Sequence, residues 1–297
     1  MRILLLGASG FIGSCLHEQL EADHEVFAAS NAAVDGRRSV VVDLADRASV
    51  DNVLAQTNPE VVVSCAGVVE NSERASLNVT FTTNLLDAIL ASNVSVKKII
   101  ISGSAAEYGI VKDDKVPIKE DDELNPVGFY GTSKADETRT ALRYKHEHGL
   151  PIVVARIFNP IGVGMNRKFL IPSLLAQVKK VKSGETDVIT LSRKDSTRDY
   201  INVVDVAAGI KAIIENDTSE DIYNIGSGTS TSNARLAELI LEKYMFEPQP
   251  QIVETAIEPE QKVASIADIS RITKELGWSP IMSIEQTIKD IVDAEER

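Results

Sequence analysis

Residues 1–14 read MRILLLGASGFIGS, and the rest of the chain is arranged around them. The apolar run Ile3–Leu6 predicts a buried strand that stops at a glycine, and Cys15–Leu20 has the pattern of a helix. Glycines in such a strand–turn–helix unit allow a tight turn and let the backbone approach a pyrophosphate, which the helix N-terminus attracts. A glycine triplet alone is also compatible with a purely structural turn. In this context it predicts a dinucleotide site, whose residues are Gly7, Ser9, Gly10, Phe11, Ile12 and Gly13.

The composition limits the class of protein. The 297 residues suffice for one large α/β unit and a smaller one, and 43% hydrophobic with 25% charged residues is ordinary for a globular enzyme. No apolar run approaches the ~20 residues that span a bilayer, so we expect a cytoplasmic protein without membrane contact. The net charge of −13 argues against nucleic acid as a partner but leaves room for a small anion held by a few arginines.

Cysteines and histidines indicate neither a disulfide nor a metal site. Cys15 falls on an expected helix and Cys65 at an expected strand end, where free buried thiols fit a reducing compartment. The four histidines lack metal-ligand spacing, so no metal is expected.

Short apolar runs alternate with amphipathic stretches up to about residue 157. The runs that predict strands are Ile3–Leu6, Val26–Ala29, Val40–Val42, Val61–Ser64, Lys98–Ile101 and Ile152–Ala155. Helices are expected between them, including Leu77–Leu90 and Thr132–Lys145. Buried strands that alternate with helices predict an α/β fold with a Rossmann-type, doubly wound parallel sheet. Residues 1–157 would then form the dinucleotide-binding domain.

Beyond residue 157 the pattern is less regular. Helices are expected at Phe169–Val181, Val203–Ile214, Ser232–Tyr244 and Ile284–Val292, and strands at Val188–Leu191 and Ile222–Ile225. The Pro-, Gln- and Glu-rich stretch Glu247–Pro259 predicts a surface loop. We expect residues 158–297 to form mainly a smaller α/β substrate-binding lobe, with some elements returning to the first domain.

The end of the second expected strand bears on the choice of cofactor. A site that selects NAD usually has an acidic residue here for the ribose 2′-OH, whereas this chain has Ser30 and Asn31, followed by Arg37 and Arg38. Small polar groups and arginine accept a 2′-phosphate, so NADP is favoured over NAD. The alternative is that the two arginines belong to a solvated loop.

Two further strand ends complete the predicted cofactor site. Asp43 and Leu44 close the third strand, where a carboxylate could accept a hydrogen bond from the adenine amino group. Cys65, Ala66 and Gly67 form a small-residue turn after the fourth strand, which lets the backbone approach the cofactor. Packing is the favoured role for Cys65, and a nucleophilic role is the alternative.

Three separate residues suggest chemistry at the same edge of the sheet. Tyr130 and Lys134 lie four apart at the start of an expected helix and so share one face, and Ser104 follows the fifth strand, where open α/β sheets bind ligands. Each alone has an ordinary explanation, because such pairs occur by chance and serine is common in turns. Found together, in this order and behind a glycine motif, the three residues specifically indicate an active site.

Over nearly its whole length the chain resembles the extended short-chain dehydrogenase/reductases that modify nucleotide sugars. The motifs that carry the resemblance are GASGFIG, Asp43-Leu44, SGSAAEYG, Asn78 in NVTFTTNLLDAI, YGTSK, RIFNPIGVG, TRDYINVVDVA and LGWSP. The resemblance implies that Tyr130 is the acid/base, that Lys134 is its electrostatic partner and holds the nicotinamide ribose, that Ser104 donates to the reacting oxygen, and that Asn78 supports them. It also implies a homodimer formed through the Tyr130 helix.

The same resemblance implies how the substrate is held. Asn159 and Arg198 match positions that contact the nucleotide diphosphate, and Arg167 and Lys168 are weaker additions. For Arg198 the alternative is an ion pair with Asp199 or Asp205. The substrate-binding set is then Ser104, Ala105, Tyr130, Asn159, Lys168 and Arg198.

The residues after Ser104 narrow the reaction. Dehydratases of this family carry an Asp-Glu pair there, whereas this chain has Ala105 and Ala106, and Glu107 would point to the other side of an extended segment. The missing acid after the second strand, together with the resemblance of SGSAAEYG and RIFNPIGVG to reductase segments, favours NADPH-dependent reduction of a nucleotide-linked 4-keto-6-deoxyhexose at C4. An NAD-dependent 4-epimerase is the alternative, and a non-catalytic dinucleotide sensor is disfavoured because Tyr130, Lys134 and Ser104 are all present. The sequence leaves the nucleotide base and the C4 stereochemistry open.

Overall fold

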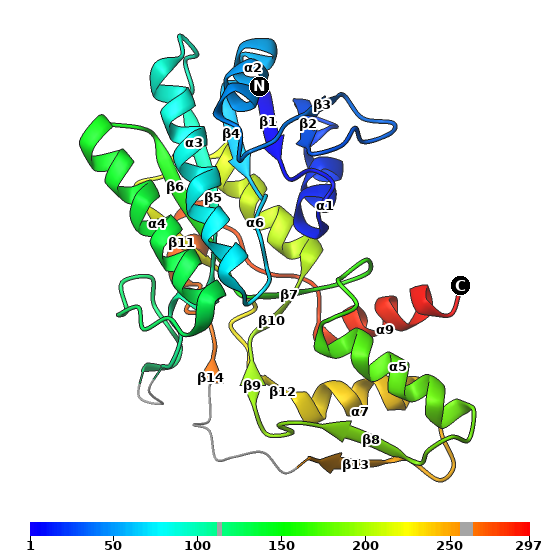
Figure 1. Ribbon diagram of the computed structural model, residues 1–297. Helices are drawn as coiled ribbons and strands as arrows, with labels where there is room; N and C mark the ends of the chain where they lie inside the picture. Colours follow the sequence, from blue (N-terminus) through cyan, green and yellow to red (C-terminus); the bar gives the residue numbers. More distant parts are fainter. Residues whose placement is uncertain (112–114, 256–263) are drawn as a thin grey trace.

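The structure is a computed structural model that describes residues 1–111, 115–255 and 264–297 (Figure 1). A seven-stranded sheet has the order β11-β6-β5-β4-β1-β2-β3, and every neighbouring pair in it is parallel. Its strands are β1 (Arg2–Leu6), β2 (Glu25–Ser30), β3 (Ser39–Val41), β4 (Val61–Ser64), β5 (Lys98–Ser104), β6 (Ile152–Ile157) and β11 (Ile222–Ile225). The Rossmann-type α/β fold expected from the sequence is confirmed.

Helices cover both faces of this sheet because both faces of its strands are apolar. In β1, Ile3 and Leu5 join the apolar cluster on one face, and Leu4 and Leu6 join the cluster on the other, as the two-residue period of a strand requires. The first face is covered by α1 (Phe11–Leu20) and α6 (Val203–Glu215). The second is covered by α2 (Arg47–Thr57), α3 (Leu77–Ala91) and α4 (Gly128–His148).

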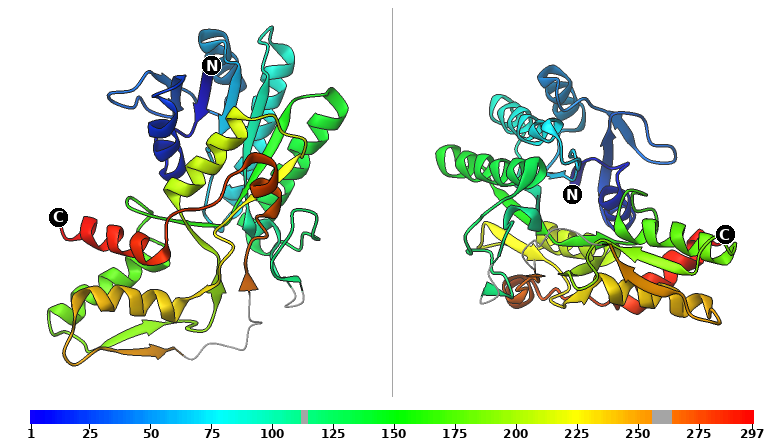
Figure 2. Two further views of the ribbon diagram at one scale, coloured as in Figure 1. Left: turned by 180° about the vertical axis from the view of Figure 1, so that it is seen from behind. Right: turned by 60° about the horizontal axis from the view of Figure 1, so that its bottom comes forward.

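A second lobe lies below the carboxyl edge of the sheet (Figures 1 and 2). Its apolar core is formed by α5 (Leu170–Lys182), α7 (Asn233–Tyr244), α9 (Ile284–Glu295) and β8 (Val188–Leu191), which pairs with β13 (Gln251–Glu254). The remaining elements are β7 (Asn159–Ile161), β9 (Thr197–Arg198), β10 (Tyr200–Asn202), β12 (Thr231–Ser232), β14 (Ala264–Ser265), α8 (Ser270–Leu276) and the 3-10 turns η1 (Glu73–Ser76) and η2 (Ala105–Glu107).

The chain crosses between the lobes more than once. α6 packs on α1, and β11 pairs with β6 at the edge of the main sheet, although both follow residue 157 in sequence. The predicted boundary at residue 157 falls at the end of β6, just before β7, and stays a prediction.

Two details differ from the sequence expectations. The stretch Glu247–Pro259 was expected to be a loop, but Gln251–Glu254 forms β13, because it pairs in register with β8. Residues 256–259 of that stretch lie outside the described residues. α1 begins at Phe11 rather than Cys15, so Phe11, Ile12 and Gly13 are in its first turn.

Among the described residues, no helix is long and apolar enough to cross a membrane, and no group of three or more His, Cys, Asp or Glu side chains is placed to hold a metal ion. Cys15 and Cys65 are free thiols and are half-buried.

Candidate active site

The glycine turn has no room for a side chain at two of its positions, Gly7 and Gly13. Gly7 has a φ of +81°, and a Cβ there would lie 2.6 Å from the backbone nitrogen of Ala66. A Cβ at Gly13 would overlap the carbonyl oxygen of Gly7. The turn is tied to β2, because the N–H groups of Gly7 and Ala8 donate to the carbonyl of Ala29 at 2.8 and 3.2 Å. These glycines therefore hold β1, the turn and α1 together.

Among the residues that the structure describes, the first N–H groups of α1 have no acceptor. Gly10 caps the helix without a side-chain hydrogen bond, and the first intrahelical bond runs from Ser14 N–H to Gly10 O at 2.8 Å. The N–H groups of Phe11, Ile12 and Gly13 precede that bond, so they have no intrahelical acceptor. Ser9 and Gly10 are exposed beside them. This is the geometry that receives a pyrophosphate.

The two candidate arginines of the loop after β2 point to different places. Arg37 turns onto the glycine turn, where its guanidinium donates to the carbonyl of Ala8 at 2.8 Å, and Glu18 of α1 lies 3.6 Å from it. Arg38 instead pairs with Glu25 at the other end of β2 and covers the ring of Phe27. The structure brings Arg37, but not Arg38, to the glycine turn.

The other predicted cofactor residues border the same edge of the sheet. Ser30, at the end of β2, is buried and donates to the carbonyl of Ala32 at 2.5 Å, and Asn31 is exposed. Asp43 is exposed after β3 and accepts the N–H of Ala45 at 2.9 Å, while Leu44 is buried. After β4, Ala66 is half-buried and Gly67 is exposed.

The Cys65 thiol packs in the interior. Ser102 of β5 donates to its Sγ at 3.5 Å, and burial raises the pKa of Cys65 to about 11. A thiol with so high a pKa is a poor nucleophile at neutral pH, which supports the packing role.

Ser104, Tyr130 and Lys134 come together where β5 meets α4. Lys134 Nζ donates to the carbonyl of Ser102 at 2.5 Å, which fixes the ammonium at the end of β5. The Ser104 hydroxyl oxygen accepts the N–H of Ala106 at 3.2 Å. Among the described residues, the hydroxyls of Ser104 and Tyr130 donate to no acceptor, and both side chains are half-buried. Both O–H groups are thus free to donate to a ligand.

Two contacts set the position of the first turns of α4. Gly131 lets the helix approach η2, since a Cβ there would lie 2.8 Å from the carbonyl oxygen of Ala106. The side-chain oxygen of Asn71 accepts the backbone N–H of Tyr130 at 3.2 Å. Asn71 was missed by the sequence analysis, because nothing in the order of residues links the loop after β4 to α4.

Asn78 is fully buried and connects three elements. Its side chain pairs with both backbone groups of Val68, accepting from N–H at 2.7 Å and donating to the carbonyl at 3.1 Å, and it donates to Ser133 Oγ at 3.2 Å. Ser133 directly precedes Lys134 on α4. Asn78 therefore supports the loop after β4 and the helix that carries Tyr130 and Lys134.

Glu107 does not lie where an extended chain would put it. The segment after β5 is the 3-10 turn η2, and this turn folds Glu107 back to accept the N–H of Ser104 at 2.6 Å. Its other oxygen lies 3.0 Å from both Nε and Nη2 of Arg156, and neither side chain is more than 1% exposed. Glu107 is thus withdrawn from the cleft, and its charge is balanced. Ala105, in η2, is half-buried next to Ser104.

In the second lobe, Asn159 and Arg198 lie on short strands near the cleft. Asn159 Nδ2 donates to the carbonyl of Asp199 at 2.9 Å, and Arg198 Nη1 donates to Ser196 Oγ at 2.8 Å. Burial lowers the pKa of the Arg198 guanidinium; Tyr200 opposes this and the nearby Arg193 adds to it. The Asp199 carboxylate accepts four hydrogen bonds, from Ser227 N–H and Oγ, Gly228 N–H and Ala267 N–H. It thereby holds the loops around Arg198.

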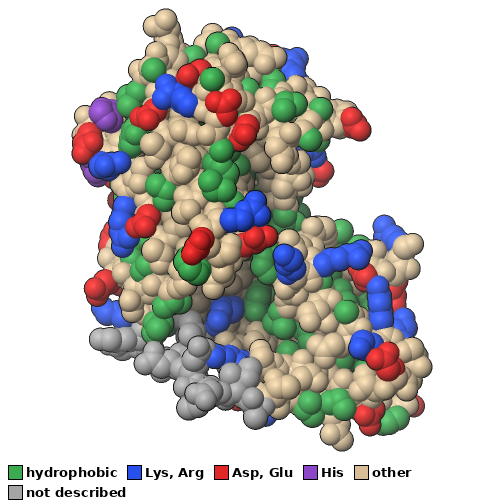
Figure 3. All heavy atoms as spheres, viewed as in Figure 1, with side chains coloured by type: hydrophobic (Ala, Val, Ile, Leu, Met, Phe, Trp, Pro, Cys, Tyr) green, Lys and Arg blue, Asp and Glu red, His purple; other side chains and the backbone are tan. Residues whose placement is uncertain are grey.

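Basic side chains are visible in the hollow between the two lobes (Figure 3). Lys168 is 80% exposed, and its Nζ lies 3.9 Å from the Glu70 carboxylate on the loop after β4. Lys168 therefore lies close to the first lobe, and its role in substrate binding stays a prediction.

The comparisons with known proteins agree with this architecture. The model of the NAD dependent epimerase/dehydratase family matches residues 3–226. The chain belongs to this family. It is 31% identical over 283 residues to the GDP-6-deoxy-D-talose 4-dehydrogenase of Aggregatibacter actinomycetemcomitans, covering 93% of this chain and 92% of the relative. It is also 30% identical over 331 residues to the UDP-glucose 4-epimerase of Bacillus subtilis, covering 98% and 95%.

A solved structure of this family has the same fold over its full length. RMD from Pseudomonas aeruginosa, complexed with NADPH, superposes with a TM-score of 0.86 and 26% identity over 100% of this chain and 99% of that protein. The relatives that the chain matches include both an epimerase and a dehydrogenase, so the similarity alone does not select one reaction.

Proposed function

We propose that this protein uses NADPH to reduce the C4 keto group of a nucleotide-linked 4-keto-6-deoxyhexose. The observation that carries the proposal is the Arg37 guanidinium against the glycine turn, at a strand end with Ser30 and Asn31 in place of an acid. A guanidinium can bind the 2′-phosphate of NADP, and no carboxylate follows β2 to repel that phosphate. An enzyme that consumes its cofactor as reductant, rather than returning the hydride to the same sugar, fits this selectivity.

The residues around the cleft fit the dinucleotide and the reduction. The glycine turn and the N–H groups of the first turn of α1 would hold the pyrophosphate, and the third N–H of the Lys134 ammonium would hold a ribose hydroxyl. When bound, the reduced nicotinamide supplies the hydride. The neutral Tyr130 phenol then gives its proton to the C4 oxygen, while the Ser104 hydroxyl donates a hydrogen bond to that oxygen.

Dehydration is disfavoured by the position of the carboxyl groups. The two positions after Ser104 are alanines, and Glu107 is buried in an ion pair with Arg156. Loss of water from a sugar needs an acid and a base beside the ring. The relative named as a GDP-6-deoxy-D-talose 4-dehydrogenase supports redox chemistry at C4 instead, and the NADPH complex of RMD supports NADPH as the cofactor.

The proposal is tested by following NADPH oxidation with purified GDP- and dTDP-linked 4-keto-6-deoxyhexoses. We expect the absorbance of NADPH to decay and the sugar to be recovered with a C4 hydroxyl. Tyr130→Phe is the matched control, because it keeps the ring and removes the proton donor, and a loss of about 10²–10⁴-fold in turnover is expected. No decay with either substrate removes this assignment.

The 30% identity to the Bacillus subtilis UDP-glucose 4-epimerase makes NAD-dependent 4-epimerisation the second candidate. The same purified protein distinguishes the two. An epimerase interconverts two nucleotide sugars without net oxidation of added NADPH, whereas a reductase consumes one NADPH for each sugar.

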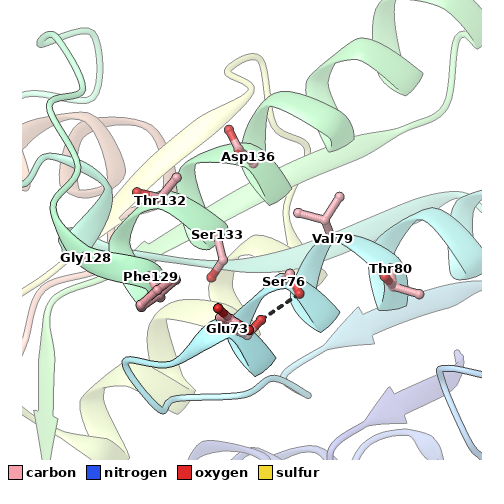
Figure 4. A pocket seen from close by; sticks show the side chains of 9 residues that line it. All are labelled: Glu73, Ser76, Val79, Thr80, Gly128, Phe129, Thr132, Ser133 and Asp136. Atoms are coloured by element: carbon pink, nitrogen blue, oxygen red, sulfur yellow. Dashed lines mark hydrogen bonds between the residues drawn. The ribbon is translucent and has the colours of Figure 1, made fainter.

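A homodimer through α3 and α4 is part of the proposal. A groove of about 710 Å³ runs between the two helices, and Phe129, which is 53% exposed, lies in its wall (Figure 4). Its lining residues are Glu73, Ser76, Val79, Thr80, Gly128, Phe129, Thr132, Ser133 and Asp136. Sedimentation equilibrium of the wild type and of Phe129→Asp tests this: a dimer that the substitution converts to monomer is expected, and a monomeric wild type contradicts it.

A further inference from the structure

Glu137 is a buried acid to which the chemistry above gives no role. It follows Lys134 by three residues on α4, and its side chain is 3% exposed. One carboxylate oxygen accepts the Lys134 ammonium, and the other accepts the Thr82 hydroxyl of α3 at 2.7 Å. Both oxygens are therefore occupied, and the acid is fixed between two helices directly beneath the lysine.

The Lys134 ammonium remains charged in this setting. Burial is the largest single cause and lowers the pKa of Lys134, but attraction to the Glu137 carboxylate is the largest of the opposing causes, and the pKa is raised overall. An ammonium carries three N–H donors, of which Glu137 and the Ser102 carbonyl take two among the described residues. The third is left for a ligand.

The other titratable groups around Lys134 leave its charge uncompensated. Tyr130 shares α4 with it, Glu107 faces it from η2, and Cys65 faces it from the loop after β4. Glu107 is balanced by Arg156, and the Cys65 thiol, with its pKa of about 11, is neutral at neutral pH. The nearest groups of α3, Asn78 and Thr82, carry no charge. Among the described residues, Glu137 is thus the carboxylate that pairs with Lys134 and has no other cationic side chain as a partner.

We propose that Glu137 is a positioning residue that fixes Lys134 and offsets much of its charge, so that Tyr130 is held as a neutral phenol, ready to donate a proton. The inference rests on the roles proposed for Tyr130 and Lys134. An isolated ammonium beside a phenol favours the phenolate, whereas an ammonium paired with a carboxylate acts on the phenol only as a weaker dipole. A neutral phenol is the form that a carbonyl reductase needs, while an enzyme that starts by oxidising an alcohol needs the phenolate.

The test is a pH titration of tyrosinate absorbance in the cofactor-free protein. The chain has six tyrosines, so the curve of the Tyr130→Phe variant is subtracted in each background to isolate one phenol. Glu137→Gln keeps the size of the side chain and one acceptor oxygen and removes the negative charge. We expect the Tyr130 midpoint to move to lower pH by about one pH unit. An unchanged midpoint overturns the proposal.

A second variant decides the question if Glu137→Gln does not fold. Lys134→Met with Glu137→Leu replaces the whole buried pair by apolar side chains, a change that proteins often tolerate. If the two charges offset one another at Tyr130, the midpoint stays close to the wild-type value. If Lys134 instead acts with its full charge, the midpoint rises by about one pH unit or more, and the proposal fails.

Thr82→Val is the matched control for a purely structural effect. It removes the hydroxyl donor to Glu137 but changes no charge, so thermal stability falls while the Tyr130 midpoint remains nearly constant. The titration uses neither substrate nor cofactor. Its outcome therefore stands apart from the NADPH assay, and either proposal can fail while the other survives.

Discussion

Two buried ion pairs lie near the carboxyl end of β5, and their surroundings differ. Glu107 and Arg156 are 0% and 1% exposed, and the guanidinium also donates to the Tyr108 hydroxyl at 2.8 Å and the Glu120 carbonyl at 3.1 Å. Lys134 and Glu137 are 7% and 3% exposed, and among the described residues the ammonium keeps one unpaired N–H. We call the first pair closed, because its remaining donors are satisfied within the protein, and the second open, because one N–H of the Lys134 ammonium has no partner among the described residues.

The difference separates a structural task from a chemical one. The closed pair continues through Tyr108, which donates to Asn224 at 2.8 Å, and Asn224 N–H donates to Glu120 at 2.9 Å. This network joins β5, β6 and β11 behind Ser104 and fixes the backbone that presents its hydroxyl. The open pair lies on α4, the helix that also carries Tyr130, and the role that we propose for it is in the chemistry of that phenol.

Among the substitutions that test this comparison, Glu107→Gln should have the largest effect on the free energy of unfolding. It leaves the Arg156 guanidinium without a counter-charge where water cannot reach it, so we expect a loss of about 3–5 kcal/mol in the free energy of unfolding. Urea denaturation measures the loss. Glu123→Gln is the matched control, because that side chain is exposed and should change stability by less than about 0.5 kcal/mol. Equal losses for both would show that the closed network contributes little.

Glu137→Gln should destabilise the protein less, by about 1–3 kcal/mol. The amide still accepts a hydrogen bond, the Lys134 ammonium keeps the Ser102 carbonyl, and the Lys134 side chain is 7% exposed compared with 1% for Arg156. The same urea experiment measures it. A loss as large as that of Glu107→Gln would contradict the distinction between a closed and an open pair.

Arg37→Ala extends the comparison to a pair at the surface of the cofactor site. Glu18, the partner of Arg37, is 69% exposed, so we expect little change in stability and about a tenfold increase in the Kd for NADPH, with NADH binding unchanged. Fluorescence titration measures both cofactors. Arg38→Ala is the matched control, since that guanidinium is held by Glu25. Equal losses for the two arginines would contradict the role given to Arg37.

Lys168→Ala should have the smallest effect. Its pair with Glu70 spans 3.9 Å with the lysine 80% exposed, and such pairs contribute less than about 1 kcal/mol. We expect thermal melting to change little. A large drop in the melting temperature would indicate that this contact holds the two lobes together.

Local sequence patterns predicted the parts of the site that depend on neighbouring residues. The strand, glycines and helix of residues 1–14 are contiguous, and the four-residue spacing of Tyr130 and Lys134 sets a shared helix face. Glu137 was within reach of the same reasoning, because residues three apart on a helix also meet, but its burial depends on Thr82 from α3. The bend that turns Glu107 toward Arg156 and the contact between Asn71 and Tyr130 were not visible in any local pattern.

Local patterns in the chain were enough to predict the Rossmann-type sheet and the family and to propose the residues of the site, because hydrophobic periodicity and fixed spacings act over a few residues. Tertiary contacts determine which buried charges are paired, as in Glu107 with Arg156 and Lys134 with Glu137. They also determine that Arg37 rather than Arg38 lies on the glycine turn, and that Gln251–Glu254 forms a strand. Those outcomes depend on contacts between segments far apart in the chain, whose free energies arise only once the segments have packed.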